Sequence, residues 1–215
     1  MPDEFKNAED KPEEPGLMTV MTDRKFRRGT WTMFFWTFFF MWTGIDALNM
    51  YSNVIIVKMN EPRIHAGKEP FFNAEVGSVL VGLTQFVGSL LAYFSVTKFN
   101  RITLLFWGHI AMGLLWFAVA MSNKYEWNML ANLFISIFII IFSMTEGPLI
   151  WMYGAEVLND SQLGIGGLGF TVNLLCIAYL TEYIIKWIEP EGLFFIFSGT
   201  TLIGAFWIKA FLKET

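Results

Sequence analysis

The chain has 215 residues, of which 54% are hydrophobic and 18% are aromatic, whereas only 16% are charged. Because soluble domains typically carry about 25% charged residues, this composition excludes an ordinary soluble domain and favours a membrane protein. The formal net charge of −4 indicates little about partners, since the charged residues gather at the chain ends and between the apolar stretches.

Residues 1–29 form an N-terminal tail that differs in kind from the rest of the chain. The tail is acidic, contains prolines at positions 2, 12 and 15, and ends in a basic cluster of Arg24, Lys25, Arg27 and Arg28. Such a segment cannot bury a core, so we expect it to become ordered only against a partner. The basic cluster predicts a juxtamembrane anchor at the lipid headgroups and does not predict nucleic-acid binding.

Six apolar stretches follow the tail, each long enough to cross a bilayer as a helix. They cover residues 30–57, 76–97, 102–121, 129–153, 163–185 and 192–212. We therefore predict an all-α membrane protein whose six transmembrane helices form one domain over residues 30–215. An even number of spans places both termini on the same side of the membrane. The single cysteine, Cys176, is expected to be a small buried side chain of the fifth stretch.

The basic residues predict which side of the membrane the termini face. When the two lysines of the distant tail are set aside, eight Lys and Arg residues fall on the side of the termini and five on the other. Cytoplasmic loops carry an excess of Lys and Arg. We therefore expect both termini to face the cytosol, or the matrix if the membrane is the mitochondrial inner membrane.

Glycine and proline residues interrupt the later stretches. Pro148, preceded by Gly147, removes a helical hydrogen bond and clashes with the preceding turn, so we expect a kink there. In lipid the freed carbonyl must find another partner, which places such a break against protein or a wet cavity. An ordinary proline kink explains the pair equally well.

Four glycines open the fifth stretch and predict close helix packing: Gly164, Gly166, Gly167 and Gly169.

Four ionisable side chains lie within the predicted spans, namely Asp46, His109, Glu146 and Glu182. A charged group costs about 2.5–3.5 kcal/mol at the centre of a membrane helix unless it is paired or hydrated. These residues either form a proton or cation relay, or are satisfied by neighbouring helices, cavity water or a partner, and we favour the second interpretation. The sequence shows neither a cluster of metal ligands nor a nucleophile paired with a base, so we predict no enzyme, no metal site and no cofactor.

The spacing of Gly147, Pro148, Trp151 and Glu156 resembles the tenth helix of the sugar porters in the major facilitator superfamily. In that family a Gly-Pro pair is followed by a tryptophan and, at the cytoplasmic end, by a glutamate. Other segments resemble the seventh, eleventh and twelfth helices of the family in the same order, namely residues 43–52, Asn173 and residues 193–215. The resemblance covers residues 30–215 and implies the six-helix C-terminal half of a sugar porter.

Several positions depart from the family pattern. Phe40 and Met41 stand where the family has two glutamines that hydrogen-bond the sugar, and Asp46 stands where it has an asparagine. Ile150 replaces the second proline of the tenth helix, and Leu174 replaces the tryptophan of the eleventh. A sugar hydroxyl needs convergent donors and acceptors in a mostly apolar pocket, so these replacements favour a loss of sugar binding.

The resemblance nevertheless implies roles for some of the remaining residues. If a sugar is bound, Asp46, Trp151 and Asn173 are the implied substrate contacts. The residues Lys98, Arg101 and Glu156 are the implied remnants of the family's cytoplasmic gate, most of whose other charged members are missing.

Two functions fit these observations. In the first, which we favour, the chain is a transport-inactive accessory subunit of a larger membrane complex, such as an assembly of the mitochondrial inner membrane. Its partners are then lipid and other membrane subunits, which cover the face that would meet the missing half. In the second, the chain is a half-size transporter of a sugar or of a proton-coupled solute, working as a homodimer or with a separate N-terminal half. From the initial methionine and the distinct tail we expect that this chain lacks an N-terminal half.

Overall fold

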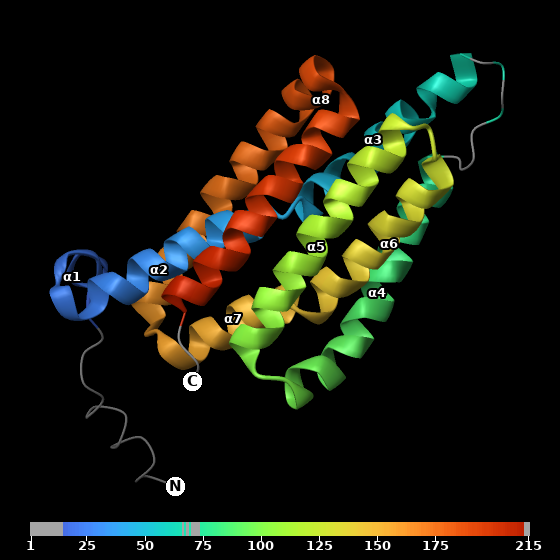
Figure 1. Cartoon of the computed structure of the whole chain (residues 1–215). Helices are drawn as coiled ribbons and strands as arrows, with labels where there is room; N and C mark the ends of the chain where they lie inside the picture. Colours follow the sequence, from blue (N-terminus) through green and yellow to red (C-terminus); the bar gives the residue numbers. More distant parts are fainter. Residues whose placement is uncertain (1–14, 66, 68, 70–73, 213–215) are drawn as a thin grey trace, which may run out of the picture.

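The computed structural model describes residues 15–65, 67, 69 and 74–212. Residues 1–14 of the predicted tail and the last three residues of the chain lie outside this part. Within it the regular structure is entirely helical, which confirms the predicted fold class (Figure 1). The helices are α1 (Leu17–Thr22), α2 (Arg24–Met41), α3 (Ile45–His65), α4 (Ala74–Lys98), α5 (Arg101–Lys124), α6 (Asn128–Met144), α7 (Glu146–Val157) and α8 (Asp160–Phe211).

These helices build the six predicted spans, although the helix boundaries differ from the sequence prediction. The first span consists of α2 and α3, the fourth consists of α6 and α7, and α8 contains both the fifth and the sixth. Among the described residues, four helical segments are long and apolar enough to cross a membrane: Glu75–Lys98, Arg101–Lys124, Asn128–Val157 and Asp160–Phe211.

The long helix α8 is a hairpin of two helices, as Figure 1 shows. Glu189 interrupts it with φ 62° and ψ 166°, and Pro190 follows. A proline disfavours helical backbone in the residue before it, which explains the bend at this position. α2 begins and α8 ends at the same end of the bundle, here called the terminal end (Figure 1). The opposite end, with the α8 bend and the α5–α6 link, is the far end.

The prediction of one continuous first helix is wrong, because the backbone breaks between α2 and α3. Gly44 adopts φ +91°, a conformation that favours glycine. A Cβ atom at this position would lie 2.6 Å from Cδ2 of Phe197 on α8. Both the backbone conformation and the close approach of α8 therefore require glycine at the break.

The second break separates α6 from α7 at Thr145, with φ −117° and ψ −80°. Pro148 lies in the first turn of α7, where a missing backbone N–H breaks no hydrogen bond of the helix. In a continuous helix, a proline ring clashes with the carbonyl group four residues earlier. For Pro148 that carbonyl group belongs to Met144. The interruption thus falls three residues before the proline, at the point where that clash is relieved.

Side chains from other helices satisfy carbonyl groups next to both breaks. Trp116 Nε1 of α5 donates to the carbonyl oxygen of Thr43 at 2.7 Å, and Thr200 Oγ1 of α8 donates to that of Trp42 at 2.8 Å. At the second break, Ser95 Oγ of α4 donates to the carbonyl oxygen of Met144 at 3.0 Å. This arrangement meets the requirement that irregular backbone at membrane depth be covered by protein.

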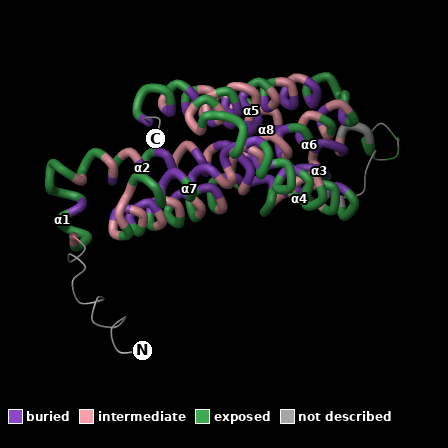
Figure 2. The backbone as a smooth tube through the Cα atoms, turned by 90° about the horizontal axis from the view of Figure 1, so that it is seen from below, coloured by how far each residue is buried: buried purple, intermediate pink, exposed green. Residues whose placement is uncertain are grey.

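Aromatic side chains fill the centre of the bundle. The fully buried Trp116 ring lies 4.6 Å from Phe138, 5.2 Å from Phe194 and 5.5 Å from Phe197, measured between ring centroids. Figure 2 shows buried positions where the helices face one another and exposed positions around the outside of the bundle. Cys176 is on that exposed surface, so the expectation that it is buried is wrong.

Candidate functional site

The predicted sugar-contact region lies between the two helix breaks and is lined by aromatic rings. Phe40, near the end of α2, lies 5.3 Å from Phe142 of α6 and 5.7 Å from Phe170 of α8. Phe40 and Met41 are both buried, at 6% and 0% exposure. The two positions where the family carries amide side chains are therefore occupied by packed apolar groups.

Two of the three predicted sugar contacts, Trp151 and Asn173, are related through Phe170 of α8. Trp151 of α7 is 41% exposed and its ring lies 5.5 Å from that of Phe170. Asn173 follows Phe170 by three residues on α8, which places both on one side of the helix. The Asn173 amide is buried and its Nδ2 donates to the carbonyl oxygen of Gly169 at 2.8 Å, so its own carbonyl oxygen and its second N–H are left for a ligand.

Asp46 is separate from this pair. It lies in the first turn of α3, next to the first break, and it is half-buried. Its buried Oδ2 atom has no hydrogen-bond partner in the described part of the chain. No hydrogen bond or ion pair among the described residues joins Asp46 to Trp151 or Asn173. A carboxylate oxygen without a partner retains its capacity to accept a hydrogen bond.

A buried polar cluster joins three helices next to the second break. Trp36 Nε1 of α2 donates to Glu146 Oε1 of α7 at 2.7 Å, and Glu146 Oε2 lies 3.4 Å from His109 Nδ1 of α5. His109 Nδ1 also lies 3.1 Å from the carbonyl oxygen of Leu105. Both ionisable side chains are completely buried. With a single proton between them, the acid and the imidazole carry no net charge together, which is the form that a membrane interior tolerates.

The sequence indicated Glu146 and His109 as separate groups and did not indicate Trp36. Trp36 and Glu146 are 110 residues apart, so no local spacing signals their contact. Glu182, the fourth predicted intramembrane group, lies on the exposed surface of α8 and accepts a hydrogen bond from Lys186 Nζ at 2.6 Å. It belongs to the far end of the bundle and not to its interior.

The predicted gate remnants lie at the terminal end. Arg101 at the start of α5 and Glu156 near the end of α7 form an ion pair. Lys98 ends α4, is exposed, and forms no ion pair with any described residue. The structure therefore links two of the three residues, and through them it fastens α5 to α7.

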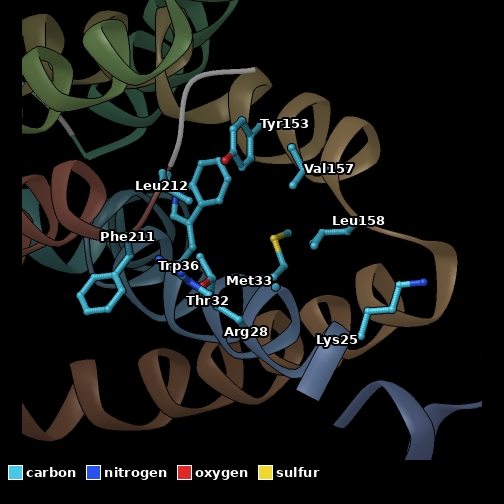
Figure 3. Close-up of a pocket in the computed structure, with 11 residues that line it drawn as sticks. Lys25, Arg28, Thr32, Met33, Trp36, Tyr153, Val157, Leu158, Phe211 and Leu212 are labelled. Carbon is cyan, nitrogen blue, oxygen red and sulfur yellow. The ribbon is translucent and has the colours of Figure 1, made fainter. Parts of the chain in front are cut away.

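A pocket of about 290 Å³ opens at the terminal end between α2, α7 and the end of α8 (Figure 3). Lys25 and Arg28 belong to its lining from the first turns of α2, and Trp36 of α2 and Tyr153 of α7 also line it. The rings of Trp36 and Tyr153 meet edge to face at 5.4 Å. Because Trp36 both lines this pocket and donates to Glu146, a single indole separates the pocket from the buried cluster.

Comparisons with known proteins test the predicted resemblance. The sequence model of the family described as "Sugar (and other) transporter" matches residues 3–215. The chain is 29% identical over 182 residues to Hexose transporter 1 of Plasmodium falciparum, covering 80% of this chain and 34% of that protein. It is 25% identical over 183 residues to the glucose transporter GlcP of Staphylococcus epidermidis, covering 80% and 39%. The chain spans little more than a third of the length of these relatives.

A solved structure shows the same fold. The proton:xylose symporter XylE, a member of the major facilitator superfamily bound to 6-bromo-6-deoxy-D-glucose, superimposes with a TM-score of 0.73 at 16% identity. The match covers 92% of this chain and 43% of the symporter, as expected for one six-helix half. The chain is thus an integral, multi-pass membrane protein that belongs to the sugar transporter family of the major facilitator superfamily.

Proposed function

We propose that this chain forms one half of a solute transporter and completes the solute pathway together with a second six-helix half. The second half is either an N-terminal half or another copy of this chain. The observation that carries the proposal is the pair of helix breaks, at Gly44 and Thr145, beside one aromatic cluster. Broken helices near the membrane midplane, at the interface of two repeats, are where transporters of this type bind their substrates.

The proposed solute is a small polyhydroxylated molecule. This class follows from the relatives, which are named as hexose and glucose transporters and, in Arabidopsis thaliana, as a probable polyol transporter. The exposed face of Trp151 supplies an apolar surface for a sugar ring. Asp46 and Asn173 supply acceptors for hydroxyl groups. With Phe40 and Met41 in place of amides, fewer hydrogen bonds reach the solute, so a higher KM than in an amide-lined site is expected.

The competing role is that of a transport-inactive accessory subunit. That prediction rested on the loss of the amide ligands and on an acidic tail expected to be ordered by a partner, and the comparisons with known transporters do not support it. Membership of a transporter family agrees with the prediction that the chain is not an enzyme. The terminal end, with its excess of basic residues, is proposed to face the cytosol, following the positive-inside rule.

Uptake by proteoliposomes separates the two roles. The chain, purified with whatever membrane partner accompanies it, is reconstituted and offered radiolabelled hexoses and polyols, with GlcP as a parallel positive control. We expect saturable uptake that falls about tenfold in Trp151→Ala, since about 1.4 kcal/mol of lost binding corresponds to that factor. The matched control is Trp107→Ala, because Trp107 is 62% exposed on α5 and is placed outside the proposed site.

The results for the two variants decide between the functions. Saturable uptake that responds to Trp151→Ala and not to Trp107→Ala supports the transporter half. An assembly that takes up none of these solutes, while GlcP transports glucose under the same conditions, supports the accessory role.

A further inference from the structure

One face of α2 points away from the bundle and carries basic residues followed by aromatic residues. Arg24, Arg28, Trp31 and Phe35 follow one another at intervals of three or four residues, which places them along one side of the helix. All four are exposed. The opposite side of α2 is buried in the bundle and includes Met33, Trp36 and Phe40. The basic and aromatic residues therefore do not serve the packing of the six helices.

The end of α8 turns this face into a groove. Trp207 and Phe211 stack at 5.3 Å with an interplanar angle of 22°, and Phe39 of α2 lies 5.4 Å from Trp207. The resulting groove has a volume of about 720 Å³ and is lined by Arg24, Arg27, Arg28, Trp31, Thr32, Phe35, Phe39, Trp207 and Phe211. Its side chains come from α2 and α8 only, and it adjoins the pocket that Tyr153 and Trp36 line, because Arg28, Thr32 and Phe211 belong to both linings.

The three arginines that line the groove form no ion pairs with described neighbours. Arg24, Arg27 and Arg28 are exposed in the first turns of α2. The adjacent Asp23 caps α2 by accepting a hydrogen bond from the backbone N–H of Lys25 at 3.0 Å. A planar guanidinium matches the geometry of a phosphate group through two parallel hydrogen bonds.

The dimensions of the groove match one leaflet of a bilayer. From residue 24 to residue 28 the helix rises about 6 Å, and from residue 31 to residue 39 it rises about 12 Å. Half of a hydrocarbon core is about 15 Å. The arginines therefore lie at headgroup depth when the aromatic part of the groove lies in the acyl region, and tryptophan is enriched near this boundary in membrane proteins.

We propose that this groove binds one anionic glycerophospholipid from the leaflet at the terminal end. Arg24, Arg27 and Arg28 hold its phosphate, and an acyl chain lies along Phe35, Trp207 and Phe211. Basic pockets between membrane helices bind anionic headgroups. A zwitterionic lipid carries the same phosphate, but the cationic part of its headgroup is repelled by the three arginines, so the anionic lipid is preferred. The site does not depend on whether the chain transports a solute.

Lipid retention by the full chain tests the charge requirement. The chain is purified in detergent, mixed with equal amounts of phosphatidylglycerol and phosphatidylcholine, and examined by native mass spectrometry. We expect about tenfold more bound phosphatidylglycerol, and the loss of this preference in the triple variant Arg24→Gln, Arg27→Gln, Arg28→Gln. The control variant Lys58→Gln, Lys124→Gln, Lys186→Gln removes the same number of charges from the far half of the bundle and keeps the preference.

Fluorescence quenching tests the position of the acyl chain and does not need the arginine variant to fold. Phosphatidylglycerol with brominated acyl chains should quench the chain in liposomes more than brominated phosphatidylcholine does. Trp207→Phe should remove most of that difference. Trp187→Phe should leave it unchanged, because Trp187 lies 84% exposed near the α8 bend at the far end.

Three results would overturn the lipid site. The first is equal retention of both lipids by the unmodified chain. The second is an unchanged preference in a folded arginine variant, or unchanged quenching in Trp207→Phe. The third is a wild-type dimer that becomes a monomer in the arginine variant, which would make the groove an interface between two copies of the chain.

Discussion

A single buried polar residue, Glu146, links the helices next to the second break through its contacts with Trp36 and His109. Glu146 begins α7, is fully buried, and accepts a hydrogen bond from the Trp36 indole while facing the His109 ring. A buried donor that loses its acceptor costs about 1–3 kcal/mol. The carboxyl group of Glu146 is therefore important mainly as an acceptor that joins α2 and α5 to α7.

Glu146→Ala and Glu146→Gln should differ in stability for this reason. The alanine variant leaves the Trp36 N–H without an acceptor, so we expect a loss of about 2 kcal/mol. In a chain of this length that loss lowers the Tm by about 4–8 °C. Glutamine keeps an acceptor oxygen at nearly the same place and should cost less than about half as much. Thermal unfolding in detergent measures both values.

The exposed Glu182 supplies a control for the Glu146 variants. Its pair with Lys186 lies on the surface, where ion pairs contribute about 0–1 kcal/mol, so Glu182→Gln should leave the Tm nearly unchanged. Equal losses in Glu146→Ala and Glu146→Gln would show that the Trp36 hydrogen bond does not hold these helices together.

At the scale of whole helices, α2 and α8 pack closely because glycines remove side chains from their contact. A Cβ atom at Gly166 would lie 2.5 Å from Cγ of Met33, and one at Gly169 would lie 2.9 Å from Cδ2 of Phe34. A Cβ atom at Gly164 or Gly167 would meet nothing within 4 Å. Only two of the four neighbouring glycines are therefore required by helix packing.

Two double variants test this distinction. Gly166→Ala with Gly169→Ala should destabilise the chain by about 1–3 kcal/mol, because added methyl groups overfill a packed contact. Gly164→Ala with Gly167→Ala should be neutral or stabilising by up to about 1 kcal/mol per residue, because alanine favours helix over glycine. Thermal unfolding of the two proteins under one set of conditions compares them directly. A similar Tm for both would mean that α2 and α8 are not in close contact at these positions.

The ends of α5 and α7 are joined by the ion pair between Arg101 and Glu156. Their side chains are 27% and 41% exposed, so solvent screens the pair and we expect a coupling energy of only about 0.5–1 kcal/mol. A double-mutant cycle of Arg101→Ala, Glu156→Ala and the combined variant isolates this coupling from other effects. Strictly additive losses would show that the pair contributes nothing to holding the two helices.

For the whole molecule, the six spans place successive links at alternating ends of the bundle. The α4–α5 link belongs to the terminal end and the α5–α6 link to the far end (Figure 1). The family and the structure establish a multi-pass membrane protein, and we therefore expect these two links to lie on opposite sides of the membrane.

Cysteine labelling checks this topology. In a Cys176→Ser background, Asn100→Cys and Glu126→Cys are exposed to a membrane-impermeant maleimide added to sealed vesicles. We expect only one of the two variants to be labelled from outside, and the other only after permeabilisation. Labelling of both from the same face would contradict the arrangement of six spans. If Asn100→Cys is the cytosolic position, the orientation that the basic residues predict is also confirmed.

Much of this architecture was accessible from the amino-acid sequence. A run of about 20 consecutive apolar residues is long enough to cross the bilayer as a helix. Such a run is a local property of the chain and can be recognised from the sequence alone. The six spans, the common end of the two termini and the all-α class therefore followed without a structure. The family was suggested by a resemblance in several segments together, of which Gly147, Pro148, Trp151 and Glu156 form one.

The tertiary structure alone decided which residues meet. The position of the first break depends on Phe197 and Trp116, which contact residues about 70 to 150 positions earlier in the chain. The contact of Glu146 with Trp36 and the unequal roles of Gly166 and Gly167 likewise depend on how separate helices pack. Helix association in a membrane is driven by close packing and interhelical hydrogen bonds, and these interactions join residues whose separation along the chain carries no periodic signal.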